Sequence, residues 1–259
     1  MTLWEENLKG RDHTQDDNLR FRNGIKAIPA SSIAEQLYCE MKIEHEYVNG
    51  EIETETKNEG TELHEKLLAM EEATIEEIIK GIGTQKTFVA SFPIAAKFQG
   101  LSLVGIPDAV VFEKSVPKYV LELKTTAKGD TTRIYDSQKA QALIYGLLLE
   151  SIGFDCSNLD LVIVRYRSTA LSQKEKSKFL QRMVTSLLNK SYLNLAVKSR
   201  YEIVPHSLTY NKSNAVRVLN ETRGYWLSER DPIPTTNPNK CKSCEFRDMC
   251  QFSLVKARE

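Results

Sequence analysis

The sequence has neither a net charge nor a long apolar run, and both absences narrow the functions open to it. Its 35 Lys and Arg residues balance 35 Asp and Glu residues, so net charge gives no indication of a nucleic-acid partner. No apolar run reaches the roughly 18 residues needed to cross a bilayer, and segment 1–22 lacks the apolar stretch of a signal peptide. We therefore expect a soluble, cytoplasmic protein without a membrane partner.

Charge is nevertheless distributed unevenly along the chain. The segment from Glu35 to Lys80 contains fourteen acidic and four basic residues, whereas the segment from Arg165 to Arg200 contains nine basic residues and one acidic residue. A segment this basic can follow a phosphate backbone, although a solvated helix face that binds nothing explains it equally well. The candidate DNA-binding side chains are Arg165, Arg167, Lys174, Lys176, Lys178 and Arg182.

Hydrophobic residues make up 41% of the chain, enough to build a substantial core. Their spacing predicts helices over 33–47, 59–79, 137–151, 173–195 and 214–223. It predicts β-strands over 88–94, 101–112, 119–125 and 159–164. We therefore expect an α/β fold, organised as a polar N-terminal arm (1–28), a core (29–200) and a C-terminal helical and cysteine-bearing region (201–259).

Three charged residues fall within the predicted strands. Asp108 is expected in the middle of one strand, and Glu122 and Lys124 project from one face of the next because they are two residues apart. Phosphodiester hydrolysis needs oxygen ligands for Mg²⁺ or Mn²⁺ and a lysine near the attacking water. In isolation the three residues are a weak motif, which a plain ion pair on an edge strand would explain better.

Two further short motifs accompany these residues. Gly60-Thr-Glu-Leu-His64 places a histidine near the start of the second helix, and Gln141-Ala-Leu-Ile-Tyr145 places an amide and a phenol on one face of a later helix. His64 could bind a metal, while Gln141 and Tyr145 could contact the phosphate backbone or brace Lys124. Taken singly, each has a plainer explanation: His64 as a capping or solvent-facing residue, and Tyr145 as a core aromatic.

The order of these motifs resembles that of the RecB-type PD-(D/E)xK nucleases over residues 31–146. The four motifs are, in sequence, GxxxH, GxxD, ExK and QxxxY. The resemblance implies a restriction-endonuclease-like core. The implied metal ligands are His64, Asp108, Glu122 and the backbone carbonyl of Leu123. The implied catalytic residues are Lys124, Glu122, Asp108, Gln141 and Tyr145. Pro107 departs from the pattern, because a proline directly before Asp108 removes a strand hydrogen-bond donor.

Cysteine is scarce, and four of the five cysteines have the spacing of a metal site. Cys241, Cys244 and Cys250 form a CxxC motif followed by a third cysteine, and Cys39 lies in a helical, polar segment far upstream. In a reducing compartment such spacing indicates metal before disulfides. Ligands divided three and one favour an iron–sulfur cluster, with structural zinc as the alternative. We expect Cys156 to be an unpaired structural thiol.

The arrangement of one cysteine before the nuclease motifs and three after them is similar to that of the iron–sulfur nucleases. Some of those nucleases are fused to helicases, but this sequence lacks the GxxxxGK[ST] phosphate-binding loop of a helicase. The chain thus resembles the CRISPR-associated RecB-like exonucleases over residues 31–252, although its N-terminal arm is longer than expected. The resemblance implies a 4Fe–4S iron–sulfur cluster that joins the helical additions at the two ends of the fold.

The same resemblance implies 5′-to-3′ exonuclease action on single-stranded or frayed DNA, with Mg²⁺ or Mn²⁺ as the second cofactor. It further implies that the protein trims spacer precursors together with the CRISPR integrase subunits. A non-catalytic, metal-stapled adaptor that binds nucleic acid through a degenerate nuclease core is the alternative. Assembly into a homo-oligomer stays open.

Overall fold

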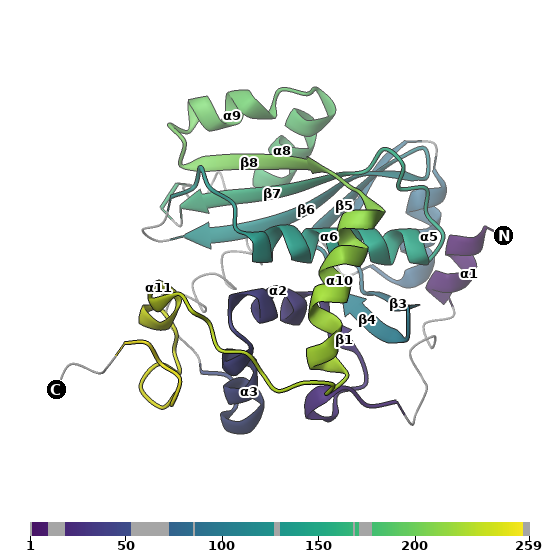
Figure 1. Ribbon diagram of the computed structural model, residues 1–259. Helices are drawn as coiled ribbons and strands as arrows, with labels where there is room; N and C mark the ends of the chain where they lie inside the picture. Colours follow the sequence, from purple (N-terminus) through teal and green to yellow (C-terminus); the bar gives the residue numbers. More distant parts are fainter. Residues whose placement is uncertain are drawn as a thin grey trace.

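A computed structural model describes residues 2–9, 19–52, 73–84, 86–126, 130–167, 169–170 and 178–255, which form two β-sheets surrounded by helices (Figure 1). The helices are α1 (Leu3–Lys9), η1 (Arg22–Gly24), α2 (Ala30–Tyr38), α3 (Glu40–Asn49), α5 (Ile75–Gly83), α6 (Asp136–Ser151), α8 (Phe179–Leu188), α9 (Tyr192–Lys198), α10 (Lys212–Trp226) and α11 (Pro238–Lys242). The strands are β1 (Ile28–Pro29), β2 (Thr87–Ala90), β3 (Ile94–Phe98), β4 (Leu101–Gly105), β5 (Ala109–Glu113), β6 (Val116–Thr126), β7 (Asp160–Arg167) and β8 (Ile203–Thr209). The expected α/β architecture is present.

The larger sheet has the order β2-β5-β6-β7-β8, and all neighbouring strands are antiparallel except β6 and β7. Parallel neighbours need a crossover connection, and α6 supplies it between these two strands. Alternate residues of β5 serve opposite faces: Val110 and Phe112 join the core beneath α6, whereas Val111 joins the core beneath α8. Helices therefore cover both faces of this sheet.

The smaller sheet has the order β1-β4-β3 and lies beside α2, which packs on α6 (Figure 1). β3 and β4 form an antiparallel hairpin whose turn residues, Gln99 and Gly100, both have positive φ. Positive φ at both residues lets the chain reverse direction tightly between the two strands. β1 pairs in parallel with β4, with Ile28 opposite Leu103, so the segment after the N-terminal arm completes this sheet.

The strand predicted to run through Asp108 is in fact two strands. β4 ends at Gly105 in the smaller sheet and β5 begins at Ala109 in the larger one, so the prediction that Asp108 lies mid-strand is wrong. Pro107 accounts for the break, because it cannot donate a ladder hydrogen bond and it restricts the residue before it. Asp108 is thereby placed where the chain passes from one sheet to the other.

Two predicted helices are each divided. The helix expected over 33–47 breaks at Cys39, whose extended backbone (φ −169°, ψ 120°) separates α2 from α3. In the helix expected over 173–195, residues 173–177 lie outside the described residues. The remainder forms α8 and α9, with Lys190 at positive φ between them. Apolar spacing continues across both breaks, so periodicity alone did not reveal them.

The helix expected over 59–79 lies mostly outside the described residues. Its last part belongs to α5, which begins at a capping box between Thr74 and Glu77 and continues to Gly83. The elements that were not predicted include α1, η1, β1, β8 and α11, and β3 shares only Ile94 with the predicted strand over 88–94. α1 buries Trp4 and Leu8 although its surroundings in the sequence are polar, so part of the polar N-terminal arm packs on the core.

Candidate active site

The charged pair at the centre of the site comes from β6. Because side chains alternate along a strand, Glu122 and Lys124 face α6, while Leu121 and Leu123 enter the opposite core. Glu122 is only 4% exposed. Its Oε1 lies 2.6 Å from Nζ of Lys124, so the two residues share one face as predicted.

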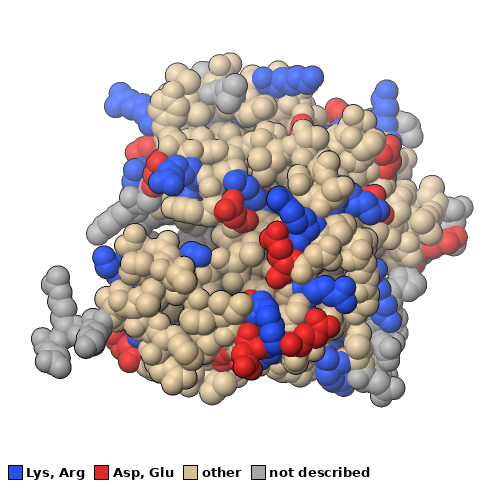
Figure 2. Space-filling view, in the orientation of Figure 1, with Lys and Arg blue, Asp and Glu red and all other residues tan. Residues whose placement is uncertain are grey.

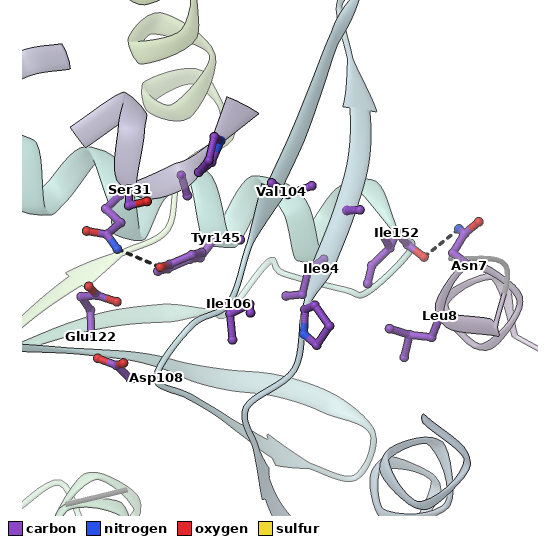
Figure 3. A pocket seen from close by; sticks show the side chains of 16 residues that line it. Asn7, Leu8, Ser31, Ile94, Val104, Ile106, Asp108, Glu122, Tyr145 and Ile152 are labelled. Atoms are coloured by element: carbon purple, nitrogen blue, oxygen red, sulfur yellow. Dashed lines mark hydrogen bonds between the residues drawn. The ribbon is translucent and has the colours of Figure 1, made fainter. Parts of the chain in front are cut away.

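Asp108 reaches the same place from the connection between the two sheets. β5 and β6 pair with Ala109 opposite Leu121, which sets Asp108 beside the segment that carries Glu122. The backbone N–H of Leu123 donates a hydrogen bond of 2.5 Å to Oδ2 of Asp108. Both carboxylates line one cavity (Figure 3). Asp108 therefore lies close to Glu122, and it is the connection between β4 and β5 that places it there.

Helix α6 contributes an amide and a phenol to this network. Nζ of Lys124 donates to Oε1 of Gln141 at 2.9 Å, and Nε2 of Gln141 donates to the Tyr145 hydroxyl at 2.8 Å. The spacing of i and i+4 places both side chains on the helix face that covers β6. Glu122, Lys124, Gln141 and Tyr145 thus form a continuous series of polar contacts that fixes the ammonium group.

The environment of Lys124 favours its charged form. Burial opposes the charge, but the carboxylates of Glu122 and then Asp108 outweigh burial, so the pKa of Lys124 is raised. The pKa of the Tyr145 phenol is also raised, first by burial and then by the charge of Glu122. Lys124 is therefore a fixed positive charge, which is the state that stabilises an anionic phosphorus centre.

The network opens into a cavity of about 570 Å³. Asp108 and Glu122 lie at one end of the cavity, and Asn7 and Leu8 of α1 lie at the other (Figure 3). The walls between the two ends are mostly apolar and come from the smaller sheet and the start of α2. Nothing in the sequence indicated that α1 is part of this site, because α1 lies about a hundred residues before Asp108.

A second cavity, of about 630 Å³, lies on the other side of Gln141. Lys124 lines it, together with Tyr38 and Lys42 of the helices that flank Cys39. Ser31 and Gln141 line both cavities. The charged pair of β6 therefore borders two cavities, with Glu122 on the first and Lys124 on the second.

The donor set fits a hard divalent cation. Mg²⁺ and Mn²⁺ prefer carboxylate and carbonyl oxygens, and Asp108 and Glu122 bring two carboxylates to one cavity beside the backbone of Leu123. Among the residues that the structure describes, no three His, Cys, Asp or Glu side chains form a group that could hold a metal ion. His64, the third side chain expected from the sequence, lies outside those residues.

The cysteines expected to bind a cluster line a single small cavity, formed where α2, α3 and the C-terminal segment meet. These cysteines are Cys39, Cys241, Cys244 and Cys250. The free space of about 20 Å³ is close to that of one buried water, and the thiols as they lie do not form a metal-holding group within the described chain. Cys156 is buried elsewhere, and burial raises its pKa to about 12.

Polar contacts fasten the C-terminal segment to α2 and α3. The Tyr38 hydroxyl donates to the Lys240 carbonyl at 2.6 Å, and Nζ of Lys240 donates back to the Leu37 carbonyl at 2.9 Å. Both carboxylate oxygens of the buried Glu40 accept hydrogen bonds from the Arg230 guanidinium. The three C-terminal cysteines are therefore held next to Cys39 by hydrogen bonds and ion pairs that do not involve the thiols.

Those of the predicted basic residues that the structure describes are not gathered at the site. Lys178 and Arg182 are exposed on or beside α8, which covers the opposite face of the sheet from Glu122. Arg165 is 4% exposed, donates to the Arg133 carbonyl at 2.6 Å and lies over the Tyr135 ring. Arg165 therefore braces the segment before α6, and the expectation that it lies on a DNA-binding surface is not met.

Two other members of the basic group, Lys174 and Lys176, lie outside the described residues, and Arg167 ends β7. On the face seen in Figure 2, Lys and Arg side chains are interspersed with Asp and Glu across the middle and lower parts. Charge of one sign does not dominate that face, so the surface alone does not trace a path for a nucleic acid.

The fold and the site together define an α/β protein with an Asp…Glu-x-Lys site at the seam between two sheets. The family model of the PD-(D/E)XK nuclease superfamily matches residues 27–251, and the chain belongs to this superfamily. No curated protein matches the chain. The solved structure of SSO0001 is similar at 15% identity and a TM-score of 0.48, over 98% of this chain and 96% of that one. No helix among the described residues is long and apolar enough to cross a membrane.

Proposed function

We propose that this protein is a Mg²⁺- or Mn²⁺-dependent deoxyribonuclease. The observation that carries the proposal is the network in which Lys124 contacts both Glu122 and Gln141, with Asp108 on the same cavity. Membership of a nuclease superfamily supports the same chemistry. Superfamily members act on nucleic acids with Mg²⁺ or Mn²⁺, so the two lines of support agree.

The metal would be held by Asp108, Glu122, the Leu123 carbonyl and His64. When bound, the cation polarises the phosphate and lowers the pKa of a water molecule. Lys124 orients the attacking water and offsets the charge that develops on the phosphate oxygens. Gln141 keeps the Lys124 ammonium in place, and the Tyr145 hydroxyl in turn keeps the Gln141 amide in place.

For the substrate, we propose single-stranded or frayed DNA degraded from an end, with 5′-to-3′ polarity, during the processing of CRISPR spacer precursors. The support is the order of the four nuclease motifs together with the division of the cysteines. The CRISPR integrase subunits would then be partners. Of the basic residues, Arg167, Lys178 and Arg182 stay candidates for phosphate contacts. These contacts would be made with a single DNA strand that continues from the site past the edge of the protein's larger sheet.

For the second cofactor, we propose a 4Fe–4S cluster bound by Cys39, Cys241, Cys244 and Cys250. The support is that all four line one cavity although about two hundred residues separate the first from the others. The thiols must rotate around the cluster, because the cavity as it lies is small. Anaerobically purified protein should be brown with absorbance that bleaches on reduction, whereas colourless protein with stoichiometric zinc would contradict the cluster.

The nuclease proposal is tested with single-stranded DNA labelled separately at each end, in Mn²⁺ or Mg²⁺. Wild type should release label progressively from one end, and chelator or Glu122→Gln should abolish release. Glu113→Gln, at the far end of β5, is the matched control and should cleave like wild type. Absence of cleavage by folded, cluster-loaded wild type would favour the non-catalytic adaptor instead.

A further inference from the structure

The cavity that begins at Asp108 and Glu122 extends well beyond the reacting groups. The residues of its middle walls are apolar, and they come from β1, β3, β4 and the connections that lead to β3 and β5: Pro29, Pro93, Ile94, Val104 and Ile106. Apolar side chains offer no ligand for a metal or a phosphate. This part of the cavity therefore needs an occupant different from the phosphate itself.

The far end of the cavity is closed by α1, and the position of α1 is fixed. The Trp4 ring stacks on the Phe154 ring with 5.0 Å between centroids. Nδ2 of Asn7 donates to the Ile152 carbonyl at 2.9 Å. Leu8, only 4% exposed, and Asn7 both face the cavity opposite the carboxylates (Figure 3). A helix from the N-terminal arm thus forms a wall of the site.

The chemistry of the carboxylate end identifies the occupant. A phosphodiester held at Asp108 and Glu122 carries a nucleoside on each side, and one of them must extend into the adjoining space. The volume of about 570 Å³ lies within the roughly 300–1,000 Å³ of sites for drug-sized ligands, a size class that includes mononucleotides. Apolar walls suit the flat face of a base, and Asn7 at the end wall supplies a polar group for its edge.

We propose that this cavity is a pocket for the terminal nucleotide of a single DNA strand, with α1 as its end wall. The inference rests on the proposed nuclease function and adds a limit on product length. A base enters the pocket only when it is unpaired and unstacked from its neighbour, so duplex ends must fray first. The wall formed by Leu8 and Asn7 restricts products to mononucleotides and dinucleotides.

Product lengths from end-labelled single-stranded DNA test the end wall, using two substitutions with opposite expected effects. Leu8→Ala opens the wall and should shift products toward longer oligonucleotides. Asn7→Trp narrows the pocket and should leave mononucleotides as the main product, released more slowly. Glu6→Ala and Glu6→Trp change the exposed side of the same helix and serve as matched controls with the wild-type distribution. Thermal unfolding verifies that each variant is folded.

Binding of thymidine 5′-monophosphate, measured by calorimetry with Mg²⁺, gives a readout that does not require cleavage. Asn7→Trp should weaken this binding by about tenfold, or about 1.4 kcal/mol, and Glu6→Trp should not. Folded wild type that fails to bind the mononucleotide would overturn the pocket. So would product lengths that stay the same in folded Leu8→Ala and Asn7→Trp. If wild type binds the mononucleotide but releases no label from DNA, the nucleotide pocket is supported and the proposed nuclease function is contradicted.

Discussion

The Tyr145 ring packs directly on the backbone of Gly105, so closely that a Cβ at position 105 would lie 2.7 Å from Cε1 of Tyr145. This contact explains why glycine suits the first position of the GxxD motif. A larger residue would push away the phenol that holds Gln141, and Gln141 holds Lys124. Two motifs separated by some forty residues in the sequence are thus parts of one packing arrangement.

Gly105→Ala should lower DNA cleavage by about 10- to 100-fold, because displacing Tyr145 misplaces the Lys124 ammonium. Initial rates on single-stranded DNA measure the effect. Gly83→Ala is the control, since a Cβ at Gly83 would meet nothing within 4 Å. Equal rates for Gly105→Ala and wild type would show that the phenol does not position the lysine.

Lys124→Met should reduce the cleavage rate by roughly 10²- to 10⁴-fold while leaving DNA affinity nearly unchanged. The substitution removes the charge that faces Glu122 but retains most of the side-chain volume. Single-turnover cleavage and fluorescence anisotropy separate the two effects. Lys139→Met, at a partly exposed position of α6, should alter neither. Loss of binding together with cleavage would make Lys124 a DNA contact instead.

Cys156 should resist alkylation in the folded protein. Burial raises its thiol pKa to about 12, so little thiolate forms at pH 8. Cys39, Cys244 and Cys250 are only partly buried, and they should react with iodoacetamide once metal is removed by chelator. Peptide mass spectrometry gives the modified fraction of each thiol. Labelling of Cys156 at the rate seen in urea would contradict its burial.

Glu150 should contribute stability that is lost in acid. Burial opposes its charge, but the Tyr210 hydroxyl at 2.6 Å and Lys212 at 2.9 Å outweigh it, so the pKa of Glu150 is lowered. A carboxyl group whose pKa is lower in the folded state stabilises the fold at pH values above its pKa in the unfolded state. This stabilisation is lost as the pH falls through the lower pKa of the folded state.

Glu150→Gln should therefore reduce the free energy of unfolding at pH 7 by about 1 kcal/mol and weaken the dependence of stability on pH below about 4.3. Urea denaturation at a series of pH values measures both quantities. Glu76→Gln changes an exposed glutamate of α5 and is the matched control. The same pH dependence in Glu150→Gln and wild type would show that this carboxylate does not contribute.

The sequence predicted the parts of the fold whose signal is local. The helix over 137–151 matches α6, and the two-residue spacing of Glu122 and Lys124 placed both on one face. The site chemistry was accessible for the same reason, since each motif lies within one element. The superfamily match agrees with that interpretation.

What could not be predicted depends on contacts between distant segments. The break at Cys39 leaves the apolar spacing unchanged, and it follows from the packing of α2 and α3 against residues 222–240. The place of Asp108 between two sheets depends on the strands with which its neighbours pair: β4 joins the smaller sheet and β5 joins the larger one. α1 is too short and too polar to stand out, and only its packing on Phe154 reveals its role.

The contacts that join α2 and α3 to the C-terminal segment also set the order in which the protein can fold. Gln36 of α2 donates to the Thr222 carbonyl across 186 residues, and Arg22 of η1 donates to the Arg230 carbonyl across 208 residues. Contacts of such high sequence separation slow folding. During synthesis, α2 and α3 cannot complete these contacts until almost the entire chain has left the ribosome. The buried carboxylate of Glu40 has no Arg230 guanidinium to pair with before that point. A chain truncated before residue 222 would leave this region permanently incomplete and exposed to aggregation.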